Sequence, residues 1–177
     1  MQGLLQTFFL AFLPITELRA SIPIGITLYH IDWKIVFCIS VLGNLVPVIF
    51  LLLFLDPVSK ILRKNQKIDK LFLWLFEKTR NRTKEKMKRF GYLALLLFVA
   101  IPLPVTGAWT GSIVAFLYKI PKKKAFLFIS IGVLIAGIIV SLLTFLGINI
   151  EQYLGFESLL LISGIVFIFY LLKKWLI

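Results

Sequence analysis

Long apolar runs without a charged residue are the feature that most restricts the fold of this chain. Two of them, Ile35–Leu55 and Ala125–Ile150, reach the roughly 20 residues that an α-helix needs to cross a bilayer. Of the 177 residues, 60% are hydrophobic, which leaves too few polar side chains to cover a soluble domain. We therefore expect an all-α polytopic membrane protein, with residues 1–177 forming a single membrane domain.

The formal net charge of +12 is distributed unevenly along the chain. Residues 60–89 hold twelve Lys or Arg, residues 119–124 hold four and residues 173–174 hold two, whereas the Tyr29–Lys34 loop holds one. Lys and Arg collect in cytoplasmic loops. We therefore expect a multi-pass protein of the cell membrane with residues 56–89, residues 119–124 and the C-terminus on the cytoplasmic side.

That placement requires the apolar run Phe90–Tyr118 to enter and leave the membrane on the same side. A re-entrant segment puts 18 basic residues inside and one outside, whereas a single crossing gives 12 and 7. The centre of the run, AIPLPVTGAWTGS, also holds prolines and glycines, which break helices and permit turns. A broken helical hairpin is therefore predicted, and one long kinked helix is the alternative.

An internal repeat appears when the chain is shifted by 90 residues, because LPITELRAS at Leu13 then falls on LPVTGAWTG at Leu103. Six of the 29 positions from Leu13 to Val41 are identical. The shift predicts two inverted repeats, residues 2–55 and 90–146, each a re-entrant hairpin followed by a transmembrane helix. Many secondary transporters have this architecture, and their binding sites lie where the short helices are interrupted.

The segments outside the repeats have their own predictions. Apolar residues in Ile61–Phe76 follow a helical spacing with lysines between them, which is typical of an amphipathic helix on an anionic membrane surface. Positive-inside placement accounts for the basic run that follows, so we expect membrane lipids as partners and no nucleic acid. The run Ser158–Leu172 predicts an additional C-terminal transmembrane helix.

The stretch FLPITELRASIPIGI places Glu17 and Arg19 in an apolar segment. A charge near the bilayer centre costs about 2.5–3.5 kcal/mol, and such residues are functional by default. Prolines at 14 and 23 free two backbone carbonyls, those of Leu10 and Arg19, from their helical donors. If the piece between the prolines is extended, Glu17 and Arg19 point to the same side. The sequence therefore predicts a polar site here.

The residue types at this site suggest its chemistry. The fork of Arg19 suits a phosphate or carboxylate. Glu17 out of water is readily protonated, so it can carry a coupling proton or bind a cationic substrate. Two alternatives stay open: an ion pair that joins the hairpins, and charges that sit in water at the interface. The candidate site residues are Pro14, Thr16, Glu17, Arg19, Ser21 and Pro23 from the first segment, and Pro102, Pro104, Thr106, Gly107, Trp109 and Gly111 from the second.

Two residues outside the broken segments are secondary candidates. Asn44 lies near Pro47 in a predicted span, and Asp56 precedes Pro57 at its predicted end. The single Cys38 and single His30 have no partners for a metal site or a nucleophile–base pair. We therefore expect a protein that is not an enzyme and that holds no metal or cofactor. Coupling to protons or sodium is left open.

The motifs PITELRASIP and PLPVTGAWTG resemble the signature pair of the small multi-drug export protein family, over nearly the whole chain. That family is distantly similar to DedA/VTT membrane proteins, which carry two opposed re-entrant hairpins and include proteins implicated in returning polyprenyl-phosphate lipids across the membrane. The chain lacks the arginines of DedA proteins near the second hairpin tip, which weakens a lipid-phosphate interpretation. The resemblance implies roles for Glu17, Arg19, Pro23, Pro102, Pro104, Thr106, Gly107 and Gly111.

These observations lead to a transporter with alternating access at a midplane site between the two hairpins. Small amphiphilic substrates would be exported against an ion gradient, with Glu17 as the protonatable group. One alternative is a flippase for an anionic lipid carrier such as polyprenyl phosphate. Another is a membrane scaffold that transports nothing. The substrate, the coupling ion and assembly into a homo-oligomer are left open by the sequence.

Overall fold

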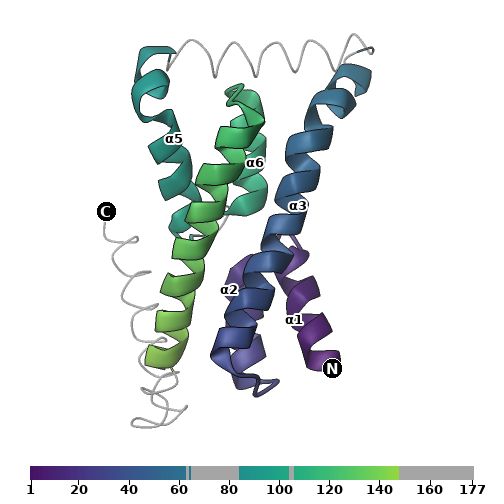
Figure 1. Ribbon diagram of the computed structural model, residues 1–177, viewed down its shortest axis with the longest axis vertical. Helices are drawn as coiled ribbons and strands as arrows, with labels where there is room; N and C mark the ends of the chain where they lie inside the picture. Colours follow the sequence, from purple (N-terminus) through teal and green to yellow (C-terminus); the bar gives the residue numbers. More distant parts are fainter. Residues whose placement is uncertain (63, 65–83, 104–105, 148–177) are drawn as a thin grey trace, which may run out of the picture. The chain divides into compact units, whose positions relative to one another are not determined.

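The computed structural model describes residues 1–62, 64, 84–103 and 106–147, and all regular secondary structure in those residues is helical (Figure 1). Met1–Ser141 form one compact unit, and Leu142–Ile177 form a second. The predicted surface helix beyond residue 62 and the predicted C-terminal helix at 158–172 lie outside the described residues. The first unit contains both of the interrupted segments predicted from the sequence.

The described residues form two long helices and four shorter ones. The stretches Trp33–Ile61 and Lys122–Gly147 are long and apolar enough to cross a membrane. The short apolar helices have 10 or 11 residues, which at 1.5 Å per residue is about half a bilayer. The elements in chain order are α1 (Gln2–Phe12), α2 (Glu17–Thr27), α3 (Trp33–Leu62), α5 (Lys84–Ala100, apolar from Gly91), α6 (Ala108–Leu117) and the helix Lys122–Gly147.

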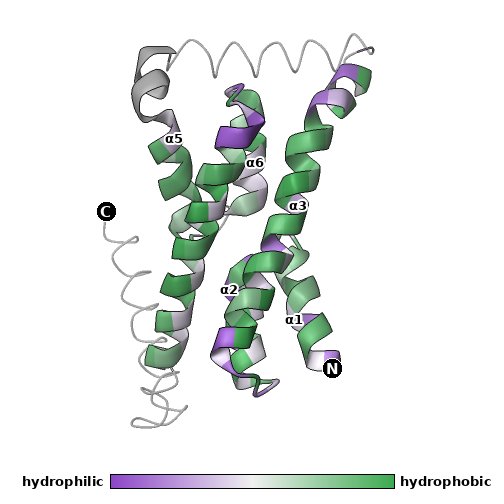
Figure 2. Ribbon diagram, viewed as in Figure 1, coloured by the Kyte–Doolittle hydropathy of each residue, from purple (hydrophilic) through white to green (hydrophobic). Residues whose placement is uncertain are grey.

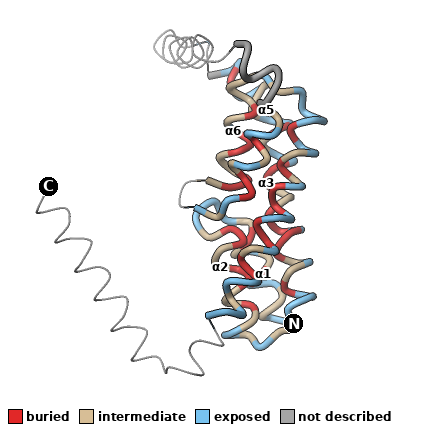
Figure 3. Tube along the Cα trace, turned by 90° about the vertical axis from the view of Figure 1, so that its left-hand side faces the viewer, coloured by how far each residue is buried: buried red, intermediate tan, exposed pale blue. Residues whose placement is uncertain are grey.

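The two long helices run antiparallel to each other. Near the end of α3, Asp56 Oδ2 lies 2.9 Å from the Nζ of Lys122, at the start of the second long helix. Near the start of α3, the ring of Phe37 lies so close to Gly137 that a Cβ there would be 2.8 Å away. The pair α1–α2 lies beside the half of α3 that holds its start, α6 lies beside the other half, and α5 packs on α6 (Figures 1 and 3).

Glycines allow each short pair to approach a long helix closely. A Cβ on Gly43 of α3 would lie 2.6 Å from the backbone oxygen of Phe8 in α1. A Cβ on Gly132 would lie 2.8 Å from the Cβ of Val99 in α5. Larger residues at these two positions would therefore push the short helices away.

Apolar side chains from alanine to isoleucine in size fill the interior, and many large apolar ones lie on the outside. Buried residues include Ala108, Ala115 and Ala125, whereas Leu42, with 59% of its surface exposed, is typical of the large residues outside. Figure 2 shows the apolar character along both long helices. Contiguous exposed apolar surface of this kind is unusual in soluble monomers, and small residues between helices are typical of membrane proteins. The distribution fits a chain surrounded by lipid.

One predicted boundary is wrong. The first span was expected to end at Leu55, with Asp56 at its terminus, but α3 continues to Leu62 with Pro57 inside it. Pro57 has no N–H for the carbonyl of Leu53. The ammonium of Lys122 lies 3.5 Å from that carbonyl and donates to it, so the helix continues with its free carbonyl partnered.

Candidate functional site

The turn between α1 and α2 is held by a threonine. The chain leaves α1 at Phe12 and re-enters a helix at Glu17. Pro14 cannot donate to the carbonyl of Leu10, as the sequence predicted. The hydroxyl of Thr16 donates to that carbonyl instead. Thr16 is therefore part of the turn itself, and the Leu10 carbonyl is occupied.

A second threonine organises the turn between α5 and α6. The Thr106 hydroxyl lies 2.8 Å from the carbonyl oxygen of Ile101 and 2.7 Å from that of Leu103, and it accepts from the Leu103 N–H at 3.1 Å. Gly107 follows with φ of 138° and precedes the first residue of α6. Pro104 lies outside the described residues.

These two turns contact each other through side chains far apart in the sequence. The Arg19 guanidinium donates to the backbone oxygen of Thr106, and also to its hydroxyl at 3.2 Å. The backbone N–H of Trp109 donates to Oε1 of Glu17 at 3.3 Å, and the indole N–H donates to the Phe12 carbonyl at 3.0 Å. Each side of this contact, which we call the tip contact, thus supplies both donors and acceptors.

The Glu17 carboxylate lies at the N-terminus of α6. Glu17 is only 5% exposed, so most of its hydration has been replaced by protein groups. A helix N-terminus carries unpaired N–H groups and a partial positive charge, which favour an anion. A Cβ on Gly107 would lie 2.7 Å from Cδ of Glu17 and would overlap the carboxylate oxygens. The approach therefore requires glycine at position 107.

The expectation that Glu17 and Arg19 lie on an extended segment is wrong. Both belong to the first turn of α2, which stays helical through Pro23. Glu17 has φ of 45°, in the left-handed region, so its side chain leaves the helix in an irregular direction. Residues two apart on a helix normally diverge. The irregular first residue lets both side chains reach the turn that holds Thr106 and Gly107.

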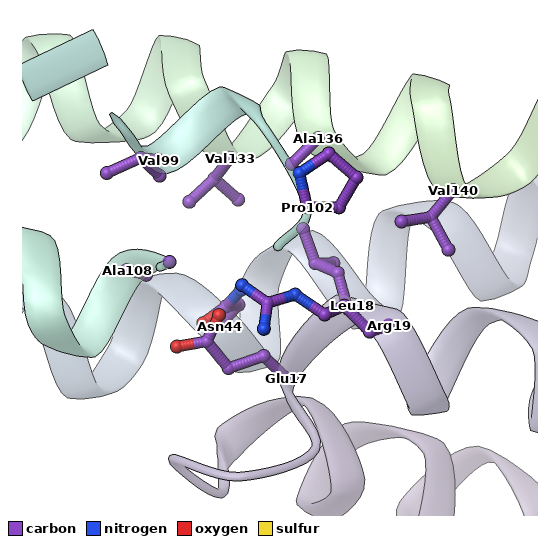
Figure 4. Close-up of a pocket in the computed structure, with 11 residues that line it drawn as sticks. Glu17, Leu18, Arg19, Asn44, Val99, Pro102, Ala108, Val133, Ala136 and Val140 are labelled. Atoms are coloured by element: carbon purple, nitrogen blue, oxygen red, sulfur yellow. The ribbon is translucent and has the colours of Figure 1, made fainter. Parts of the chain in front are cut away.

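A small cavity lies where the turns meet α3 and the second long helix (Figure 4). Its polar lining comes from Glu17, Arg19 and Asn44. Its apolar wall includes Val133 and Val140. It has about 10 Å³ for the centre of a water molecule, which is room for roughly one water. No organic substrate fits, so the site is closed in this structure.

The two secondary candidate residues lie in different parts of the structure. Asn44 lines the cavity, is 1% exposed, and its Oδ1 has no hydrogen-bond partner. Asp56 lies elsewhere and pairs with Lys122, both about half exposed, so the pair contributes little to stability. Within the described residues, no three His, Cys, Asp or Glu side chains gather where they could hold a metal ion.

The remaining sequence candidates surround the site at different depths. Pro102 lines the cavity, whereas Pro14 is exposed in its turn. Ser21 is fully buried one helical turn from Glu17, and its hydroxyl has no partner. Gly111 packs against Val99 instead of the cavity. The Phe12 carbonyl and the wall residues Val133, Ala136 and Val140 were not foreseen, because backbone oxygens and ordinary apolar residues carry no sequence signal.

Short helices joined in pairs by turns, two membrane-length helices, and a buried carboxylate at the contact between the turns place the chain among helical membrane proteins with a polar site inside. The profile of the family described as "Putative small multi-drug export protein" matches residues 17–139. This range is more than half of the chain and includes Glu17, Arg19 and the turn between α5 and α6, so the protein belongs to that family. Comparisons with curated proteins and with solved structures gave no match.

Proposed function

We propose that this protein is an ion-coupled exporter of small amphiphilic molecules, with alternating access at the cavity between the two turns. The observation that carries the proposal is the tip contact, in which a buried carboxylate sits on the N-terminus of a helix from the opposite half of the chain. Intramembrane ionisable groups of this kind mark ion and substrate pathways. The family description agrees with export.

Helix length and charge support re-entrant hairpins that enter from opposite sides. Each arm reaches about half of a bilayer. The Lys122–Asp56 pair brings the basic residues 119–124 to the same end of the unit as Lys60, in the last turn of α3. By the positive-inside rule we assign this end, together with residues 56–89 and the C-terminus, to the cytoplasm of the cell.

Backbone geometry supports the inverted repeat. Glu17 and Gly107 correspond under the shift of 90 residues, both have positive φ, and they touch. His30 and Lys119, which follow α2 and α6, also have positive φ, of 50° and 53°, although the shift of 90 residues pairs His30 with Ile120, one position further on. The long helices that come next run antiparallel. A twofold relation between the two halves, with the site on its axis, accounts for these matches.

The tip contact provides a mechanism for coupling. A carboxylate accepts hydrogen bonds more strongly than a neutral carboxylic acid does. Protonation of Glu17 therefore weakens its bond to the Trp109 N–H and removes the negative charge from the N-terminus of α6. The turns then separate more easily, and the cavity opens to one side. Release of the proton on the other side restores the contact.

An apolar groove beside the tip contact favours amphiphilic substrates. It measures about 310 Å³ and is lined by Phe12, Pro47, Phe50, Phe54 and Trp109 among others. Trp109 takes part in both the tip contact and the groove, because its backbone binds Glu17 and its side chain lines the groove. The groove equally suits the second candidate function, a lipid flippase. We rank export first because Arg19 is already engaged by Thr106.

Arg19 variants test the proposal in proteoliposomes loaded with a panel of small amphiphilic fluorescent dyes. Replacing Arg19 with alanine removes charge-assisted hydrogen bonds of about 1.5–3 kcal/mol, so gradient-driven export is expected to fall by about tenfold or more. Arg19→Lys should be intermediate, because an ammonium lacks the two-pronged donor geometry.

The control for Arg19 is Lys122→Ala, which removes a half-exposed basic residue outside the site and should leave export unchanged. Parent-like export by Arg19→Ala would contradict a role for the tip contact. Movement of a fluorescent polyprenyl phosphate by the parent, with no dye export, would favour the flippase.

A further inference from the structure

A line of buried polar side chains leads away from the cavity between α2 and α3. These helices run antiparallel, with Glu17 near Asn44 at the cavity and Gly25 against Val36 further along. Residues four apart share a helix face. The register therefore places Ser21, midway between Glu17 and Gly25, opposite the residue midway between Val36 and Asn44, which is Ser40.

Three oxygen atoms on this line have no hydrogen-bond partner, although the Asn44 side chain also hydrogen-bonds Glu17. Ser21 and Ser40 are 0% exposed and Asn44 is 1% exposed, yet Oγ of each serine and Oδ1 of Asn44 are unpaired. An unsatisfied buried polar group costs about 1–3 kcal/mol. Water is the smallest molecule that can bond all three of these oxygen atoms.

Thr7 continues the line toward the start of α1. A Cβ on Gly25 would lie 3.2 Å from its hydroxyl oxygen, and that hydroxyl donates to the carbonyl of Gly3 at 2.8 Å. Gly3 lies in the first turn of α1, at the end of the unit away from Lys122. The line thus runs from the cavity to one surface.

Three of the four positions on this line have apolar counterparts in the second half of the chain, although Ser130 and Ser141 there also have unpaired hydroxyl oxygens. Under the shift of 90 residues, Thr7, Ser21 and Asn44 correspond to Leu97, Gly111 and Leu134. Gly111 is surrounded by the side chains of Val99, Ile129 and Leu95. Only Ser40 has a polar counterpart, Ser130. The polar line is therefore a property of one side.

We propose that Thr7, Ser21, Ser40 and Asn44 form a hydrated proton route from the outer surface to Glu17. The proposal rests on the proposed function and adds the coupling ion and its side of access. Arg19 is the only other charged residue among the described groups that line the cavity; Asn44 and the apolar wall are neutral. A sodium ion beside Arg19 would meet like charge, and Arg19 already occupies the turn carbonyl that would coordinate it.

Trp109 provides a reporter for the test, because its backbone binds Glu17. In a background with Trp33, Trp74 and Trp175 replaced by phenylalanine, a rapid acid jump on purified protein is expected to change Trp109 emission. Ser21→Ala with Ser40→Ala should slow that change at least tenfold. Threonine at both positions keeps the hydroxyls and should restore the rate. Ser130→Ala removes a buried, unpaired hydroxyl from a half-buried serine off the line, and it should leave the rate unchanged.

Stability separates this role from a structural one. Removing an unpaired buried hydroxyl is expected to leave the melting temperature of the double alanine variant equal or higher. Four results would each overturn the route. Two concern the rate: the double alanine variant responds within twofold of the parent, or Ser130→Ala slows the change equally. Two concern the signal: it persists in Glu17→Gln, or a sodium jump at constant pH produces it. If export is lost in Glu17→Gln while the double alanine variant matches the parent rate, the proposed export function is supported and the proposed proton route is wrong.

Discussion

Glu17→Gln is expected to reduce ion-gradient-driven export to the background of empty proteoliposomes, while the protein still folds and inserts. Glutamine has the shape of glutamic acid, and its amide oxygen can still accept from the Trp109 N–H. It cannot bind or release a proton in the working range. The tip contact then no longer responds to pH, so the coupling step is lost although the closed structure is kept.

The measurement is dye export driven by a pH gradient, with the melting temperature in detergent recorded alongside. Asp56→Asn is the matched control, because it neutralises a carboxylate of the same chain that is half exposed and outside the site. It should export like the parent, since exposed ion pairs contribute about 0–1 kcal/mol. Coupled export by Glu17→Gln at the parent rate would exclude Glu17 as the coupling group.

Gly107→Ala is expected to have the largest effect on stability. The φ of 138° at this position is essentially restricted to glycine, and other residues there cost about 1–3 kcal/mol. The added Cβ would also overlap the Glu17 carboxylate. The two turns must then separate, so we expect a clear drop in melting temperature together with loss of export.

A double variant divides this cost into its two parts. Adding Glu17→Ala to Gly107→Ala removes the atoms that clash but leaves the backbone strain, so stability should recover partly and export should not. The coupling between the two substitutions, measured by a double-mutant cycle, should be well outside the additive range of about 0.3–0.5 kcal/mol. Strict additivity would mean that Glu17 and Gly107 do not touch in the protein.

The helical class and the two interrupted segments were predictable because they depend on residue type. Apolar runs without charge fix the long helices, and proline with glycine marks the breaks. The site was partly predictable for the same reason: a buried Glu and Arg are rare enough in such a chain to be noticed. Asn44 was recognised as a candidate because of its position beside Pro47, and it does line the cavity.

The details that were missed depend on tertiary contacts. In α3, which extends to Leu62, the carbonyl that Pro57 leaves free accepts from Lys122, and that lysine is distant in the sequence. The helical conformation around Glu17 depends on one left-handed residue at its start. The re-entrant topology and the inverted repeat stay predictions, supported by helix length, charge and backbone geometry. The relation to DedA/VTT proteins stays a prediction that rests on the sequence motifs alone.

Cysteine accessibility at the loop between α6 and the second long helix tests the central claim, opposed hairpins that meet inside the membrane, most directly. In a Cys38→Ser background, Pro121→Cys should react with a membrane-impermeant maleimide only from the cytoplasmic side, and His30→Cys only from outside. Reaction of both cysteines from the same face of the membrane would show that the two turns do not approach from opposite sides, and the account would be wrong.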